Sequence, residues 1–207
     1  MDKVEICNMA LARIGAAQIS SFNESSEQAQ ACLQFYEPCR RSVLRNYPWS
    51  FATRRVKLAL LQEKSFDYKY AYRYPVEALY IRKLYDNEKG WPLRKVKHQI
   101  VGDANGKIIL TDMDLAGAEI TADLSDASVF DAEFCEALAW KIGGEIAMRV
   151  TGNINMANYC NQAYEHFINN AKADDSNESN PDRIHVNELT MSRLVGIDDY
   201  DYMRDFD

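Results

Sequence analysis

The spacing of apolar residues along this chain changes from helical to alternating and then back again. Up to about residue 65, apolar side chains recur every three or four positions, as they do on one face of an α-helix. Between residues 66 and 124 they alternate with polar side chains, which is typical of half-buried β-strands. The helical spacing resumes at about residue 131. This order predicts an α+β fold, mainly α, in which a helical bundle of about four helices carries an inserted small antiparallel β-sheet.

Two helices are expected before the insert. The first covers residues 3–15, and the second opens at Ser25, where Gln28 completes a capping-box pattern. The second helix is expected to end near Asn46, because a Tyr-Pro pair follows and the residue before a proline disfavours the α conformation. Pro38 lies inside this helix, which either kinks there or consists of two shorter helices.

Two more helices are expected after the insert. One runs from residue 131 to residue 151, and the other begins at about Asn155. The helix at 131–151 carries small residues that would let a neighbouring helix approach closely, namely Ala137, Gly143, Gly144 and Ala147.

Tyrosines at every second position mark the first strand of the insert, at Tyr68, Tyr70, Tyr72 and Tyr74. Such a ladder usually forms one face of a sheet. The strands expected after it are Ala78–Tyr85, a segment through Val96, His98 and Ile100, Lys107–Thr111 and Glu119–Asp123. Turn sequences at 87–90 and 103–106 favour hairpins between neighbouring strands.

The composition changes at Asp174, where a polar, linker-like stretch begins. The apolar and aromatic residues that follow it stand among aspartates and are too few to fold alone, so we expect them to dock on a partner: Leu189, Leu194, Val195, Ile197, Tyr200, Tyr202, Met203 and Phe206. The chain thus divides into bundle helices at 1–65, a β-rich insertion at 66–124, the remaining bundle helices at 125–173 and an extended C-terminal docking tail at 174–207.

Charge is distributed unevenly along the chain, whose net charge is −7. Residues 40–107 contain 16 basic and 6 acidic side chains and carry +10, whereas residues 108–173 contain 3 and 10 and carry −7. Residues 1–39 carry −3 and residues 174–207 carry −7. In a ring of identical subunits, the basic face of one copy could meet the acidic face of the next.

The end of the second helix begins this cationic block. Tyr47, Trp49 and Phe51 follow the helix at once and are expected to pack in the core. The arginines are predicted instead to lie at a subunit interface, and the candidates are Arg40, Arg41, Arg45, Arg54 and Arg55.

No catalytic, cofactor or metal site is indicated by the sequence, which suggests that the protein is not an enzyme. The five cysteines are widely spread without a CxxC pair, and we expect them to be reduced core residues. The three histidines are isolated from one another, so no ligand spacing appears. We expect neither a secretory signal nor a membrane span, because the N-terminus and the apolar segments do not fit either pattern.

Two other functions compete with a structural role. The basic 40–107 segment and its tyrosine ladder could form a nucleic-acid-binding module, in which rings stack on bases and cations hold phosphates. The second alternative is a tail-associated glycan hydrolase, for which only scattered carboxylate pairs such as Asp112/Asp114 or Asp131/Glu133 are available.

Several segments together resemble the tail tubular protein A family, the head-to-tail adaptors of short-tailed phages and related prophages. The similar segments are Ile6–Gly15, Tyr36–Arg40, Tyr47–Ala52, Tyr70–Pro75, Ile109–Asp112, Phe130–Phe134 and Glu136–Ala139. They extend over most of the chain.

The resemblance implies a structural virion protein of the tail or neck, assembled in the bacterial host cytoplasm. It implies a ring of twelve copies beneath the portal protein, with a tail nozzle or tail-tube protein below. Genomic DNA would pass through the lumen of this homo-oligomer during ejection without sequence-specific binding. The resemblance also implies a helical bundle with a β-rich insertion, and a C-terminal tail that clamps the portal.

Overall fold

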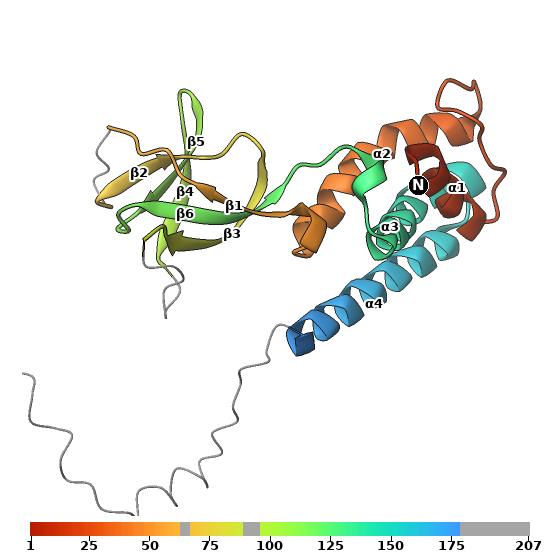
Figure 1. Cartoon of the computed structure of the whole chain (residues 1–207). Helices are drawn as coiled ribbons and strands as arrows, with labels where there is room; N and C mark the ends of the chain where they lie inside the picture. Colours follow the sequence, from red (N-terminus) through yellow and green to blue (C-terminus); the bar gives the residue numbers. More distant parts are fainter. Residues whose placement is uncertain (63–66, 89–95, 179–207) are drawn as a thin grey trace, which may run out of the picture. The chain divides into compact units, whose positions relative to one another are not determined.

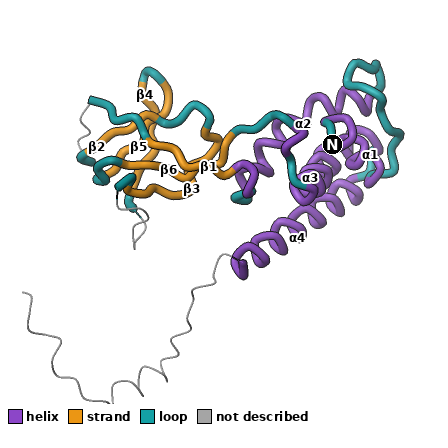
Figure 2. The backbone as a smooth tube through the Cα atoms, in the orientation of Figure 1, coloured by secondary structure: helices purple, strands orange, loops and turns teal. Residues whose placement is uncertain are grey.

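The chain has an α+β fold of four α-helices and two three-stranded antiparallel sheets in the described residues (Figures 1 and 2). The structure is a computed structural model and describes residues 1–62, 67–88 and 96–178, with side chains up to residue 170. The helices are α1 (Lys3–Arg13), α2 (Glu27–Asn46), α3 (Ala132–Thr151) and α4 (Ile154–Glu178). The strands are β1 (Thr53–Lys57), β2 (Tyr70–Arg73), β3 (Ala78–Asp86), β4 (His98–Asp103), β5 (Gly106–Thr111) and β6 (Ala116–Ala122).

Helices α1 and α2 begin at side-chain caps. Asp2 accepts a hydrogen bond from the backbone N–H of Glu5, whose carboxylate accepts one from Asp2 in return. Helix α2 is capped by Ser26 rather than by the expected Ser25, and the Ser26 hydroxyl accepts the backbone N–H of Ala29. Pro38 lies within one continuous helix, so α2 is not divided into two shorter helices.

The largest core of the described chain lies among the helices, and aromatic rings from the end of α2 complete it. Trp49 is 2% exposed, and its indole N–H donates to the carbonyl of Val43 at 3.0 Å. Its ring meets Phe134 of α3 edge-on at 5.2 Å, and Phe51 meets the same Phe134 at 5.2 Å. The prediction that the aromatics after α2 pack in the core is therefore confirmed. All five cysteines are buried and free, as expected.

Glycines on α3 let two helices approach it closely. A Cβ at Gly144 would collide with the side chain of Asn161 on α4. A Cβ at Gly143 would lie 3.3 Å from the sulfur of Cys160 and 3.7 Å from the carbonyl of Ala10 on α1. The small residues of the 131–151 segment therefore have the packing role that the sequence predicts.

The insert contains two sheets, with strand orders β1-β6-β3 and β2-β5-β4. Residues 53–61 connect them along one edge. After pairing with β6, this segment donates from Leu58 to the carbonyl of Ala116, and then from Leu61 to the carbonyl of Ala71 on β2. Strand β1 lies within the range 1–65 that the sequence assigns to bundle helices, so this assignment is wrong for residues 53–57.

A small apolar core is shared by the two sheets. It combines Ile81 of β3 and Ile120 of β6 from one sheet with Tyr72 and Ile109 from the other. Tyr70 and Tyr74 pack on this cluster beside the buried Tyr72, which confirms the tyrosine ladder as one face of a sheet. Tyr68 precedes β2 and packs on a separate cluster, so it does not share this face, and Tyr74 follows the last residue of the strand.

The chain divides into two compact units at residue 168. Helix α4 continues to Glu178, beyond the boundary at Asp174 that the composition predicts. The docking-tail residues Leu189, Leu194, Val195, Ile197, Tyr200, Tyr202, Met203 and Phe206 lie outside the described residues. No helix in the described ranges is long and apolar enough to cross a bilayer.

Candidate functional site at the helix–sheet junction

Arg40 connects the end of α2 to the chain that leaves β6. Its Nε donates to Glu37 at 2.8 Å, one Nη donates to the carbonyl of Leu124 at 2.5 Å, and the other donates to Asp123 at 2.7 Å. The Arg40 side chain is only 2% exposed. A buried guanidinium requires such partners, because an unpaired charge in the interior is very costly.

Arg41 contacts the same carboxylate from the surface. Its guanidinium lies 2.8 Å from the second oxygen of Asp123, and its side chain is 59% exposed. Asp123 therefore accepts from both arginines. The interface prediction is wrong for Arg40, which is buried and held within its own chain, and it stays a prediction for the exposed Arg41.

Glu37 completes this network on the helix side. Its carboxylate also accepts from Lys3 of α1 at 3.2 Å. Partial burial raises the pKa of Glu37, but the hydrogen bonds and charges of Arg40 and Lys3 outweigh it, so the pKa lies below its usual value. The carboxylate is therefore ionised at neutral pH, and it links α1 to α2.

The last turn of α2 meets strand β3 through arginine and tyrosine side chains. Arg45 lies over the ring of Tyr80 at 5.4 Å from its centroid, and Arg82 lies 4.8 Å from the same centroid. Lys107 lies over the neighbouring Tyr74 at 5.4 Å. Burial raises the pKa of Tyr74, and the positive charge of Arg45 opposes that shift. We call these five residues the cation–tyrosine cluster: Arg45, Tyr74, Tyr80, Arg82 and Lys107.

Arg82 has a structural role within this cluster. It donates to the carbonyls of Leu44 and Tyr47 at 2.9 and 2.8 Å, and to the hydroxyl of Thr121 at 2.7 Å. These carbonyls lie at the C-terminal end of α2, where cations are favoured by the helix dipole. Burial lowers the pKa of Arg82, and the nearby positive charge of Arg45 contributes in the same direction.

Within the described part of the chain, Arg45, Arg82 and Lys107 of this cluster form no ion pair with a carboxylate. The ion pairs of the region belong to other arginines: Arg54 lies 3.1 Å from Glu77, and Arg55 lies 3.7 Å from Glu119. The side chains of Arg54 and Arg55 are 48% and 62% exposed. The cluster thus presents net positive charge beside pairs that are already neutralised.

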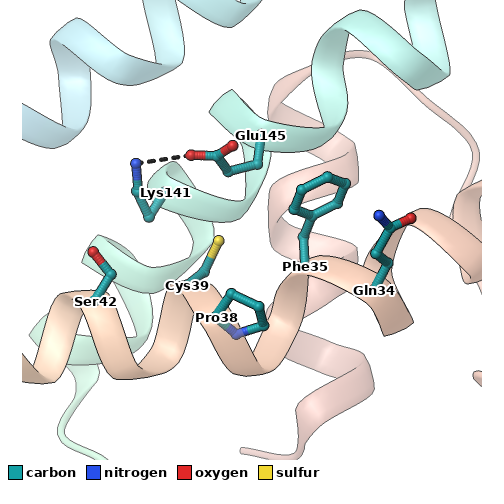
Figure 3. Close-up of a pocket in the computed structure, with 7 residues that line it drawn as sticks. All are labelled: Gln34, Phe35, Pro38, Cys39, Ser42, Lys141 and Glu145. Carbon is teal, nitrogen blue, oxygen red and sulfur yellow. Dashed lines mark hydrogen bonds and ion pairs between the residues drawn. The ribbon is translucent and has the colours of Figure 1, made fainter.

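A pocket of about 360 Å³ lies between α2 and α3 (Figure 3). Its apolar lining comes from Phe35, Pro38 and Cys39, and Lys141 forms an ion pair with Glu145 at its rim at 2.9 Å. Burial raises the pKa of the Cys39 thiol to about 12. Because the thiolate is the reactive form of cysteine, this thiol is a poor nucleophile at neutral pH.

Sequence reasoning missed Asp123, Tyr80 and Arg82 as members of the junction. A signal for Arg40 was present, because it lies four residues after Tyr36 and three before Val43, on the buried face of α2. No comparable signal identified Asp123, since its contact with Arg40 joins residues 83 positions apart.

A search of protein-family models and of curated proteins finds no match to this sequence. Among the side chains that the structure describes, no group of three or more histidine, cysteine, aspartate or glutamate residues is placed to hold a metal ion.

Proposed function

We propose that this protein is a head-to-tail adaptor: a structural virion protein that forms a ring between the portal and the tail nozzle or tube of a short-tailed phage. In this role its contacts are its function, and it is not an enzyme. The ring would form part of the conduit through which DNA is ejected.

The observation that carries the proposal is the agreement between the fold and what the resemblance implies. A helical bundle contains a β-rich insertion, and the two meet at the segment between Tyr36 and Ala52. Two of the family-like stretches, Tyr36–Arg40 and Tyr47–Ala52, lie there. The same junction presents exposed cations, as a surface that receives an acidic neighbour would.

A nucleic-acid-binding module stands second. Four of the five arginines singled out in the sequence, Arg40, Arg41, Arg54 and Arg55, already contact carboxylates of their own chain. These arginines are therefore largely neutralised within their own chain and offer little net charge to a phosphate backbone, which favours a protein partner. A gel shift with duplex DNA over a range of salt concentrations would separate the two functions, because binding through many phosphates weakens steeply with salt.

The adaptor role can be tested by the mass of the full chain alone and after mixing with the portal ring of the same phage. We expect a ring of subunits on the portal. A chain without residues 179–207, which keeps all of α4, should remain folded but fail to attach. If the full chain stays monomeric both alone and after mixing with the portal ring, the proposal is wrong.

A further inference from the structure

We infer that the cation–tyrosine cluster binds carboxylates at the start of α3 in a second copy of this chain. The inference rests on the proposed ring, and it specifies which residues make the contact between subunits.

The first argument is the uncompensated charge of the cluster. Arg45, Arg82 and Lys107 gather around two tyrosine rings, and within the described residues none of the three forms an ion pair. Like charges this close repel one another, and the effect of Arg45 on the pKa of Arg82 reflects that repulsion. An incoming anion would relieve it.

The second argument concerns the kind of anion. Arg45 and Arg82 both lie over the ring of Tyr80, so a base that stacks on this ring would compete with two guanidinium groups. Arg54 and Arg41 are already paired with Glu77 and Asp123, so they add little net positive charge along which a continuous phosphate backbone could bind. A single carboxylate needs only a local site, which two guanidinium groups can provide through short, charge-assisted hydrogen bonds.

The third argument identifies the donor. Asp131 stands at the N-cap of α3, yet its side chain caps no backbone N–H. Asp131 and Glu133 are both exposed, and neither carboxylate forms an ion pair within the described residues. Val129 beside them is 47% exposed and would supply apolar contact area at such an interface.

The contact would join two different surfaces of the same chain. Such an interface is heterologous, so repeated contacts generate a closed ring or an open filament rather than a simple dimer. A ring of copies then follows from one repeated contact.

The test measures self-association of the full chain by sedimentation over a range of concentrations. We expect Arg45→Glu to raise the dissociation constant about tenfold or more, because it places a carboxylate opposite carboxylates. Lys97→Glu is the matched control: Lys97 also lies over a tyrosine ring, that of Tyr68 at 5.9 Å, and the change in net charge is the same. Lys97 lies next to the paired residues His98 and Thr111, at one end of the β2–β5–β4 sheet, whereas Lys107 of the cluster lies near the other end. The Lys97→Glu change should therefore alter the dissociation constant less than twofold.

A charge swap then identifies the donor. By itself, D131R/E133R should weaken self-association. Combined with Arg45→Glu it should restore self-association, as a double-mutant cycle requires for groups in contact. The milder pair D131N/E133Q guards against a folding defect at the start of α3, and thermal melting checks each variant.

Four results would overturn the inference. The first three are equal effects of Arg45→Glu and Lys97→Glu, failure of the swap to restore association, and a wild-type chain that does not self-associate at any concentration. The fourth is an Arg45→Glu variant that loses binding to duplex DNA in a gel shift but keeps its self-association. The ring proposal fails separately, only if the wild-type chain also fails to assemble on the portal.

Discussion

The helical bundle and the β-rich insert are stabilised by different means. The bundle buries large aromatic and aliphatic side chains in one continuous core, including Trp49 and Phe134. The insert has two smaller cores, and its central strand β6 contributes Ala116 and Ala118 to the larger one. Backbone pairing between distant segments therefore carries more of the insert's stability. The comparison shows that the bundle is stabilised mainly by buried side chains, whereas the insert depends more on the pairing of its strands.

The largest effect is expected from a cavity in the bundle. Phe134→Ala removes a ring that contacts Trp49, Phe51 and Phe130, and it should lower the free energy of unfolding by about 3–5 kcal/mol. Leu84→Ala in the core of the insert should cost about 2 kcal/mol, near the lower end for such a change. Chemical denaturation measures both. Equal losses would remove the contrast between the two cores.

The next effect concerns the connection between the two regions. Arg40→Met keeps much of the side-chain volume but leaves Asp123 and the Leu124 carbonyl without this donor, so we expect a loss of about 3 kcal/mol. Arg41→Met removes an exposed contact to the same Asp123 and should cost less than about 1 kcal/mol. Thermal and chemical unfolding of the two variants compare a buried arginine with an exposed one. If both cost the same, burial does not determine the strength of this connection.

A smaller effect tests the packing of the insert. Gly117 of β6 lies under the ring of Tyr85, with which a Cβ would collide. Gly117→Ala should therefore cost about 1–3 kcal/mol, as overpacking does. The control is Gly102→Ala on β4, where the nearest heavy atom to a new Cβ is 3.9 Å away. It should change stability by less than about 0.5 kcal/mol, a typical limit for surface changes. A tolerated alanine at Gly117 would mean that the side chains of Tyr85 and Asn87, which a Cβ would both meet, move aside freely.

The smallest effect is a dependence on pH. Because the folded chain lowers the pKa of Glu37, the carboxylate stabilises the fold above its unfolded pKa of about 4.3, and this stabilisation is lost as the pH falls through the lower folded pKa. The side chain is 47% exposed, so we expect less than about 1 kcal/mol. The measurement compares wild type with Glu37→Gln between about pH 5 and pH 2, a range set by that unfolded value. Parallel curves for the two proteins would contradict the assignment.

Local patterns predicted the helices better than the insert. The spacing of apolar residues located all four helices, because each buries one continuous face. Strand β1 was missed because Thr53–Lys57 is mostly polar and pairs with residues at 117–121, far away along the chain. The alternating pattern predicted one sheet, but the number of sheets depends on which strands pair, and spacing along the chain does not specify that.

The candidate site was predicted only in part. The cationic block at 40–107 indicated where positive charge would gather, and Arg45 is one of its exposed members. Charge counts could not separate Arg40 from Arg45, because the difference between them is burial. Tyr80 and Arg82 joined the site only through the contact between β3 and the end of α2.

The pairing of Thr53 with Thr121 places the entrance and the exit of the insert on neighbouring strands. Residues paired in this way have Cα atoms only about 5 Å apart. The two ends of the insert therefore lie as close together as the ends of a short loop, and a brief linker could join them without separating the helices. Apart from β3, whose Arg82 donates to the end of α2, the insert can therefore change in length or sequence while the bundle keeps its fold.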